Sequence, residues 1–353
     1  MVEIKRRKSR IVKIGKVSIG GNTPIAIQSM TKFKTADISK VIGQVVGLEK
    51  VGCQIVRLAV KDQADARAIK RIKPRVNLPI VADIHFDYRL ALEAIDNGAD
   101  KIRLNPGNIY KKEEVKEVVQ AAKINHIPIR VGVNSGSVRS KQPLADSLVK
   151  SAMDYIRILE GLKFYNIVIS LKASNVLDTV SAYRKIAKLC DYPLHLGVTA
   201  TGSPFSGAIK SSIALGALLL EGIGDTIRVS LTADPKDEIA AAKGILSSLG
   251  LRNFGPQIIS CPTCGRCEVD LVRLVSKLEK KISAQDSRLW SKPLKVAVMG
   301  CVVNGPGEAK EADIGVAFGK KEGLLFRRGR LIKKVSLSDC LDYLLKGIGE
   351  LND

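Results

Sequence analysis

The feature that most constrains the fold is a repeated alternation of short apolar runs with segments of helical periodicity. Segments such as Glu113–Asn125 and Val176–Leu189 have the apolar spacing of amphipathic helices. Eight runs have the length and composition of buried parallel strands: Ile25–Met30, Ile55–Val60, Pro79–His85, Lys101–Pro106, Pro128–Asn134, Asn166–Ala173, Pro193–Thr199 and Thr226–Leu231. Eight strands alternating with helices predict a (β/α)8 TIM barrel, an α/β fold.

A doubly wound parallel sheet is the alternative interpretation of this alternation. Such a sheet normally contains fewer strands, and no G-x-G-x-x-G sequence follows the first run. We therefore expect residues 1–250 to form a substrate-binding TIM barrel, with a β-hairpin at Ile11–Gly21 before the first strand.

Near Gly250 the alternation stops and a different pattern begins. A helix-period stretch, Val269–Ile282, is followed by a β run, Leu294–Gly300, and a Gly-rich loop, Asn304–Glu308. Three further short strands and a closing helix are predicted at Ile314–Phe318, Leu324–Arg327, Leu331–Val335 and Ser338–Leu345. Residues 251–353 are thus predicted to form a small α+β domain, of a size typical for domains.

The ends of the eight apolar runs carry most of the candidate site residues. Active sites of TIM barrels lie at the carboxyl ends of the strands. The polar residues there are Gln28, Ser29, Arg57, Asp83, His85, Arg103, Asn105, Arg130, Asn134, Ser170, Lys172, His195, Thr199, Arg228 and Ser230. Four arginines and a lysine in one mouth fit a polyanion, with a diphosphate as the preferred candidate. The alternative is that some of these arginines pair with Asp83 or with helix carboxylates.

Charge and composition limit the partners. Lys plus Arg is 57 and Asp plus Glu is 35, a formal net charge of +22. Such a surface could attract nucleic acid, acidic proteins or phosphorylated metabolites, although a solvated lysine-rich surface is the simpler interpretation. Only 4% of residues are aromatic, so stacking platforms for single strands are scarce, and we expect no nucleic-acid binding.

The sequence gives no sign of membrane association. No apolar run approaches the roughly 20 residues that span a bilayer. No apolar segment of a signal peptide follows the basic start, Met1–Arg10. We therefore expect a cytoplasmic location.

Five of the seven cysteines lie in the second domain, and four of them are candidate metal ligands. Cys261 and Cys264 are separated by two residues, and Cys301 follows a predicted strand. With Cys267 these residues could form a closed zinc site of four thiolates or an electron-transfer cluster. Three cysteines with an oxygen ligand from Glu308 are a third arrangement. Spacing does not separate these possibilities, so a barrel enzyme of phosphate-ester or pterin chemistry with a structural zinc module remains an alternative.

At these residues the sequence resembles the 4-hydroxy-3-methylbut-2-enyl diphosphate synthase (IspG) family in its two-domain bacterial form. The resemblance covers nearly the whole chain, and the long segment around Cys301 is its most specific part. The segments that carry it are Cys261–Arg266, Gly300–Glu308, Gly222–Leu231, Leu194–Thr199, Arg130–Asn134 and Arg103–Asn108.

The resemblance implies a TIM barrel joined to a C-terminal domain that binds a 4Fe–4S cluster. It implies Cys261, Cys264, Cys301 and Glu308 as the cluster ligands and leaves Cys267 outside the ligand set. The implied reaction is the reductive ring opening of 2-C-methyl-D-erythritol 2,4-cyclodiphosphate. Asn304, Asp83 and His85 join Glu308 as candidate catalytic residues. The implied substrate-binding residues are Arg57, Arg103, Asn105, Arg130, Asn134, Ser170, Lys172, His195, Thr199, Arg228 and Ser230.

The resemblance also implies partners and exposes one departure. It implies a homodimer and a ferredoxin or flavodoxin as electron donor. The family usually has a glutamate after the threonine at the seventh strand end, whereas this chain has Ala200 after Thr199. A methyl group cannot transfer a proton. Three alternatives follow: Asp83, His85 or a bound water takes that role, the enzyme is slow, or its substrate differs slightly, and the sequence does not separate them.

Overall fold

The computed structural model describes residues 4–138, 143–199, 201–283 and 292–352. The chain divides into two compact units, Met1–Arg252 and Asn253–Asp353. No helix in the described ranges is both long and apolar enough to cross a membrane. Each unit is described below by itself.

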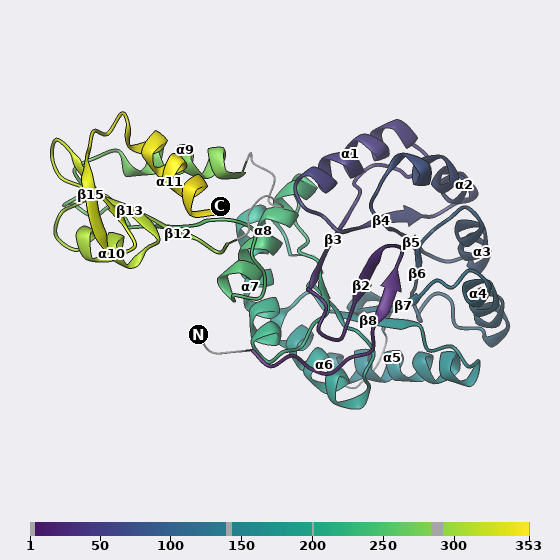
Figure 1. Cartoon of the computed structure of the whole chain (residues 1–353). Helices are drawn as coiled ribbons and strands as arrows, with labels where there is room; N and C mark the ends of the chain where they lie inside the picture. Colours follow the sequence, from purple (N-terminus) through teal and green to yellow (C-terminus); the bar gives the residue numbers. More distant parts are fainter. Residues whose placement is uncertain (1–3, 139–142, 200, 284–291, 353) are drawn as a thin grey trace. The chain divides into compact units, whose positions relative to one another are not determined.

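The first unit is an eight-stranded parallel barrel, as predicted (Figure 1). Its strands are β3 (Ala26–Met30), β4 (Ile55–Val60), β5 (Ile80–Ile84), β6 (Lys101–Leu104), β7 (Ile129–Asn134), β8 (Ile167–Lys172), β9 (His195–Leu196) and β10 (Thr226–Ile227). They follow one another in the order β8-β7-β6-β5-β4-β3-β10-β9, and a parallel bridge between Ile169 and Leu194 joins β8 to β9. β9 and β10 are shorter than predicted, although Arg228 N still donates to Leu196 O beyond their ends.

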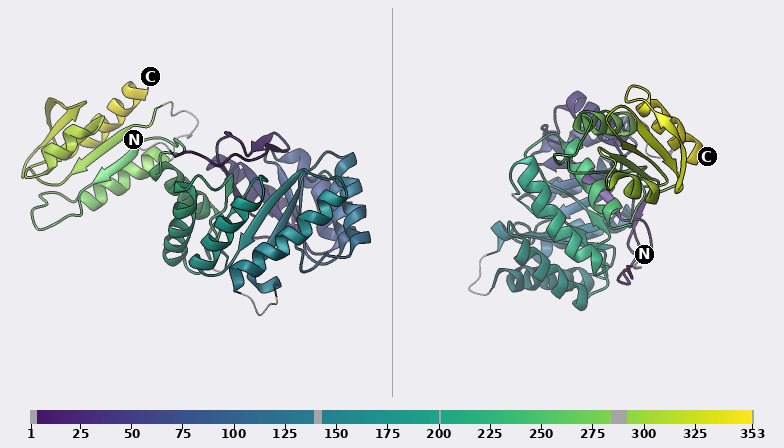
Figure 2. Two further views of the ribbon diagram at one scale, coloured as in Figure 1. Left: turned by 90° about the horizontal axis from the view of Figure 1, so that it is seen from below. Right: turned by 90° about the vertical axis from the view of Figure 1, so that its left-hand side faces the viewer.

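Eight helices lie outside the strands, as Figures 1 and 2 show. They are α1 (Ile38–Lys50), α2 (Gln63–Ile72), α3 (Tyr88–Asp96), α4 (Lys112–Ile124), α5 (Leu144–Gly161), α6 (Val176–Leu189), α7 (Pro204–Leu220) and α8 (Pro235–Ser248). Several begin at side-chain caps that the sequence supplies. The side chains of Asp62, Asn175 and Asp234 accept hydrogen bonds from the first-turn N–H groups of α2, α6 and α8.

The N-terminal hairpin closes one end of the barrel. It consists of β1 (Val12–Ile14) and β2 (Val17–Ile19). Its buried side chains form a cluster with Ile55, Val81 and Val168, which lie near the amino-terminal starts of their strands. The hairpin therefore fills the amino-terminal end with apolar side chains and leaves the carboxyl end as the functional mouth.

The second unit is a five-stranded mixed sheet in the order β11-β12-β13-β14-β15. The strands are β11 (Gln257–Ser260), β12 (Lys295–Met299), β13 (Ile314–Phe318), β14 (Gly323–Arg327) and β15 (Arg330–Val335). The first three are parallel, and β14 and β15 each run antiparallel to the strand before them. The helices are α9 (Leu271–Ser283), α10 (Gly305–Glu311) and α11 (Cys340–Asn352).

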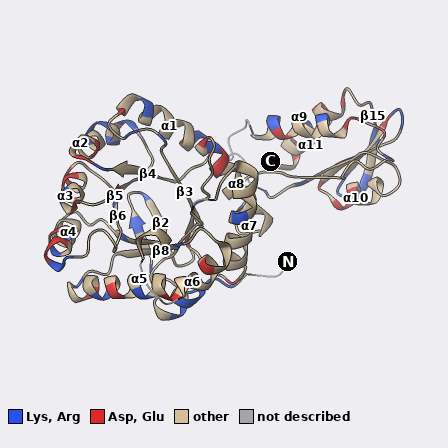
Figure 3. Cartoon of the chain, turned by 180° about the vertical axis from the view of Figure 1, so that it is seen from behind, with Lys and Arg blue, Asp and Glu red and all other residues tan. Residues whose placement is uncertain are grey.

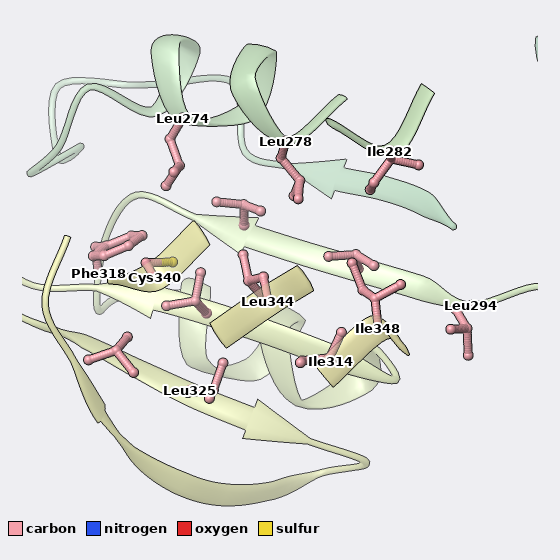
Figure 4. Packing of buried hydrophobic residues seen from close by; sticks show 14 of the residues in the cluster. Leu274, Leu278, Ile282, Leu294, Ile314, Phe318, Leu325, Cys340, Leu344 and Ile348 are labelled. Atoms are coloured by element: carbon pink, nitrogen blue, oxygen red, sulfur yellow. The ribbon is translucent and has the colours of Figure 1, made fainter. Parts of the chain in front are cut away.

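Two apolar clusters hold this sheet. Leu274 and Leu278 of α9 and Leu344 and Ile348 of α11 pack with the buried side chains of one face (Figure 4). On the other face, Ala309 of α10 packs with small residues of β12 and β13. Removing this apolar area from water contributes roughly 25 cal/mol per Å2 and fixes the strands whose ends carry the cysteines.

Two expectations for this unit were wrong in detail. The segment Asn304–Glu308 is not a loop, because α10 begins at Gly305. Pro306 lies in the first turn, where its missing N–H group has no intrahelical acceptor to lose, so a Gly- and Pro-rich sequence still starts a helix. The closing helix is longer than predicted and reaches Asn352, and the strand β11 was not predicted.

Candidate functional site

The candidate site of the first unit begins with an ion-pair group on three neighbouring strands. Arg103 lies in register with Asp83 on β5 and Arg130 on β7, so the three side chains share the inner face of the barrel. Arg103 Nη1 donates to Asp83 Oδ1 at 3.0 Å, and Arg57 Nε lies 3.6 Å from Asp83 Oδ2. The alternative that some arginines pair with Asp83 therefore holds for these two.

Glycines on the strands make room for these long side chains. A Cβ atom at Gly132 would lie 2.4 Å from Arg103 Nε, and Arg103 Nη2 donates to the Gly132 carbonyl at 2.7 Å. A Cβ atom at Gly197 would lie 2.8 Å from Lys172 Nζ. Because Gly132 and Gly197 have no side chains, the barrel interior has room for the side chains of Arg103 and Lys172.

The cations outnumber the carboxylates that face them. Burial and the neighbouring guanidinium groups lower the pKa of Arg130 and of Lys172 well below their ordinary values. Burial, followed by Arg57, lowers the pKa of Arg228 to about 10. Among the described residues, Arg130 Nε and Nη1 have no hydrogen-bond partner. An anion between these groups would supply the missing acceptors and charge.

Asp83 is an anion in this setting. Burial by itself would raise its pKa, but the charges of Arg57, Arg103 and Arg130 outweigh burial and lower the pKa to about 2. A carboxylate with such a pKa carries no proton near neutrality. Asp83 therefore suits the positioning of guanidinium groups better than the proton transfer suggested for it from the sequence.

His85 and His195 have different surroundings. The side chain of His85 is 36% exposed, and its Nε2 lies 4.0 Å from Asp83 Oδ2. His195 is fully buried, with Nε2 3.5 Å from Lys172 Nζ. Burial and then the nearby Lys172 lower the pKa of His195 well below its ordinary value, so this imidazole is neutral. Of the two, His85 is the one that solvent and ligand can reach.

The other residues predicted for the site lie at the carboxyl end of the barrel, but not all of them contact the buried arginines and Lys172. Ser170 is buried on β8, in register with Gly132. Asn105 Oδ1 accepts from Gly107 N at 3.1 Å, and Asn134 shares a capping box with Ser137. These two amides shape their own loops. The backbone of Thr199 donates to Ala173 O, and the Ser230 carbonyl accepts from the Thr201 hydroxyl. Ala200 lies outside the described residues.

Sequence reasoning missed Glu238 on α8. It is 1% exposed and lies 3.6 Å from Arg228 Nη2. Its carboxylate also accepts from Ser29 Oγ at 3.0 Å and from Lys32 Nζ at 3.1 Å. An acidic residue in the first turn of a helix is ordinary, so nothing in the sequence marked this one as a buried partner.

Lys101 was missed as well. It opens β6, is fully buried, and its Nζ has no hydrogen-bond partner among the described residues. Burial, then Arg130 and Arg57, lower its pKa well below the ordinary value. The alternation Lys101-Ile102-Arg103 places Lys101 and Arg103 on one face of the strand, which was the available signal.

The second unit has a candidate site of its own, formed by cysteines at the carboxyl ends of β11 and β12. Ser260 and Val298 are in register on these parallel strands, so Cys261 and Cys301 leave the sheet at the same end. Gly300 N donates to Cys261 Sγ at 3.4 Å. Asn304 and Glu308 follow at the start of α10, and both are exposed.

Two of these thiols are in environments that favour the thiolate. The Arg266 side chain beside Cys264 lowers the pKa of that thiol. Backbone N–H groups of Val303 and Asn304 lower the pKa of Cys301. Thiolate is the form that binds iron or zinc, so this donor set fits a metal group held by cysteines. Among the described residues, no three Cys, His, Asp or Glu side chains are close enough together to hold a single metal ion.

Cys267 is placed differently from the other three. Its thiol donates to Val269 O at 3.2 Å, and, like Cys261, it packs against the apolar core. A Cβ atom at Gly300 would lie 2.3 Å from Cys267 Sγ, so Gly300 accommodates this sulfur. The donation to Val269 O and the contact with Gly300 account for Cys267 without a metal.

Comparisons with known proteins show which family the chain resembles along its whole length. The family model for the GcpE TIM-barrel domain matches residues 9–243, and that for the GcpE protein C-terminal domain matches residues 257–350. A protein of Fusobacterium nucleatum named 4-hydroxy-3-methylbut-2-en-1-yl diphosphate synthase (flavodoxin) is 55% identical over 98% of both chains. One of the same name from Caldanaerobacter subterraneus is 53% identical over 99% of both.

Among solved structures, dihydropteroate synthase from Stenotrophomonas maltophilia matches with a TM-score of 0.54 over 69% of this chain and 98% of that one. The identity is 13%, so this similarity shows the barrel fold alone and gives no support to pterin chemistry. The family models and the full-length relatives agree with the resemblance of the cysteine segments. The chain belongs to the GcpE (IspG) family.

Proposed function

We propose that this chain catalyses the reductive ring opening of 2-C-methyl-D-erythritol 2,4-cyclodiphosphate to 4-hydroxy-3-methylbut-2-enyl diphosphate. The name of its relatives states the product. The reaction consumes two electrons and two protons and releases one water. The observation that carries the proposal in this chain is the cation group of the barrel, defined as Arg57, Arg103, Arg130, Lys172 and Arg228.

The cation group would hold the diphosphate. Its members depress one another's pKa values, so a bound polyanion would relieve their repulsion as well as satisfy Arg130. Asp83 and Glu238 would fix the directions of Arg103 and Arg228. The neutral groups expected around the rest of the substrate are Asn105, Asn134, Ser170, Thr199 and Ser230. His195, which is fully buried beside Lys172, would hold that lysine in position.

Proton delivery falls to His85 in this proposal. Asp83 is anionic near neutrality, and Ala200 has no group that transfers a proton. His85 is partly exposed at the mouth beside Asp83, where it can take a proton from solvent and pass it to a ligand. A bound water is the remaining route.

Cys261, Cys264, Cys301 and Glu308 would hold a 4Fe–4S cluster. When bound, such a cluster supplies low-potential electrons and a Lewis-acidic iron. A carboxylate is a harder ligand for iron than a thiolate and is more easily displaced, which suits Glu308 to a position that substrate can replace. Asn304, at the N-cap of α10, would orient an oxygen of the ligand beside it.

The proposal includes a flavodoxin or ferredoxin as electron donor, in the cytoplasm. The names of the relatives specify flavodoxin. Such carriers deliver one electron at a time, so each product requires two encounters.

A homodimer is the proposed assembly, in which the cluster domain of one subunit serves the barrel of the other. An apolar stripe on α7 supports an association of subunits. Phe205, Ile209 and Ile213, spaced four residues apart, are 79%, 45% and 56% exposed. Residues at this spacing share one helix face, and a contiguous exposed apolar face marks an interaction site.

An anaerobic turnover assay tests the function. Protein reconstituted with iron and sulfide is mixed with the cyclic diphosphate and dithionite, and the product is identified by mass spectrometry. We expect product from the intact protein and none from Arg130→Met with the same iron content. Full iron and sulfide without any product from the intact protein would refute the assignment. One zinc per chain in a colourless protein purified without oxygen would favour a structural module of four cysteines instead.

A further inference from the structure

The second unit carries an exposed basic strand edge. β15 is the last strand of the sheet, and within the described residues no strand pairs with its outer side. Five consecutive residues of β15, Arg330 to Lys334, are exposed. Leu331 and Ile332 among them are 55% and 53% exposed. A strand edge that is both apolar and unpaired promotes aggregation unless a partner covers it or charged residues protect it.

Charge is concentrated along this edge. Residues 320–334 contain seven Lys and Arg and one Glu, a net charge of +6. Lys320 and Lys321 lie in the turn between β13 and β14, and Lys333 and Lys334 lie near the end of β15. Figure 3 shows Lys and Arg in blue near β15. We call the set Lys320, Lys321, Arg330, Leu331, Ile332, Lys333 and Lys334 the basic edge.

The basic edge ends at the cysteine end of the sheet. Lys334 is in register with Leu324, which pairs with Ala317, which in turn pairs with Met299. Met299 is two residues before Cys301. Three strand spacings separate Lys334 from Met299, about 14 Å. The turn that holds Lys320 and Lys321 follows β13, which is parallel to β12, so it lies at that end as well.

We propose that the basic edge is the docking surface for the acidic electron carrier, a flavodoxin; this inference rests on the proposed function. Positive charge around a small apolar centre suits an acidic protein that must bind quickly and leave again. A second copy of this chain fits poorly, because pairing two such edges would bring Arg330, Lys333 and Lys334 against like charges.

The position of the edge also keeps the carrier away from the substrate side. The carrier would approach the sheet from its β15 side, whereas Cys261 and Cys301 follow strands β11 and β12, on the other side of β13. The cysteine end would therefore stay open to substrate while the carrier is bound. Each reduced flavodoxin would lose one electron there, and two such encounters would supply one turnover.

Charge reversal tests the proposal. The variant Lys320→Glu/Lys321→Glu/Lys333→Glu is compared with a control that reverses exposed lysines of α4, Lys112→Glu/Lys116→Glu/Lys123→Glu. Binding of oxidised flavodoxin is measured by the fluorescence of its flavin at low and high ionic strength. We expect the basic-edge variant to bind at least about tenfold more weakly at low ionic strength, with the difference shrinking in salt. The control should bind like the intact protein.

Turnover with dithionite distinguishes a loss of flavodoxin docking from a loss of catalysis. Because dithionite needs no docking surface, the basic-edge variant should keep its dithionite-driven turnover while it loses flavodoxin-driven turnover. Equal flavodoxin binding by all three proteins would overturn the docking proposal and leave the proposed function intact. Absence of dithionite-driven product from the intact protein would overturn the proposed function, and flavodoxin binding would still decide the docking site. A change in sedimentation of the basic-edge variant alone would assign the edge to self-association instead.

Discussion

Asp83 accepts a hydrogen bond from Arg103 at 3.0 Å inside the barrel, and both side chains are almost completely buried. The same carboxylate lies 3.6 Å from Arg57. It is therefore a central anion among the cations of the mouth, and its protonation state decides whether two guanidinium groups keep a partner.

Asp83→Asn should weaken the barrel at neutral pH by about 3–5 kcal/mol, because one partner of a buried ion pair is removed. The pKa of Asp83 is lowered to about 2 in the folded protein. A depressed pKa stabilises the folded state above the unfolded value and loses that contribution as pH falls, here between about pH 4 and pH 2. Urea unfolding from pH 6 down to 2 should show the difference between the two proteins shrinking in that window. A difference that is constant across it would contradict the assignment.

His85→Gln should lower kcat by about 100-fold with little change in KM, since general acid catalysis is worth that much and the cation group still binds the diphosphate. Steady-state kinetics with dithionite measure both constants. The control is His126→Asn. His126 is an exposed residue that follows α4, and its backbone has a positive φ of 55°, which asparagine tolerates. If the kcat of His85→Gln is unchanged, a bound water rather than His85 delivers the proton.

Glu238→Gln should destabilise the barrel by about 3 kcal/mol, because Arg228 and Lys32 lose a buried charge partner. It should also raise KM, because Arg228 is no longer held in place. Chemical denaturation and kinetics on the same preparations separate the two effects. The neighbouring exposed carboxylate provides the control, and Asp237→Asn should change stability by less than about 0.5 kcal/mol. Similar losses in both variants would show that Glu238 has no special role.

The α7 stripe gives a prediction about assembly. Ile209→Asp/Ile213→Asp should convert a dimer to monomers at micromolar concentration, because two charges would be buried in the interface without partners. Sedimentation velocity reports the state directly. Ile124→Asp changes an exposed isoleucine on α4, 77% exposed, and should leave the dimer intact. An intact dimer in the α7 variant would place the interface elsewhere.

Much of the architecture follows from local sequence patterns. The length and apolar composition of runs such as Ile55–Val60 and the helical spacing of segments such as Val176–Leu189 are local properties, and the barrel strands lie where these patterns predicted them. The short strands β9 and β10 were overestimated, since an apolar run continues there after the hydrogen-bonded ladder has ended.

Partners that come from distant parts of the chain could not be predicted in this way. Glu238 reaches Ser29 across 209 positions, and Lys101 becomes a buried cation only when the barrel closes around it. The start of α10 was hidden for a different reason. Its Gly and Pro residues have low helix propensity, and packing of Ala309 against the sheet outweighs that preference.

The cysteines provide the sharpest test of the ligand set. Cys264→Ser should lose most of the iron and sulfide that reconstitution introduces, because a serine hydroxyl is a poor substitute for a thiolate that Arg266 favours. Cys267→Ser should keep a nearly full complement and lose only about 1 kcal/mol of stability, since its thiol packs against Gly300 and donates to Val269 O. Iron and sulfide analysis with the visible absorption spectrum distinguishes the two variants. Loss of iron from Cys267→Ser to the same extent as from Cys264→Ser would mean that four cysteines bind the metal, and Glu308 would then have no place among the ligands.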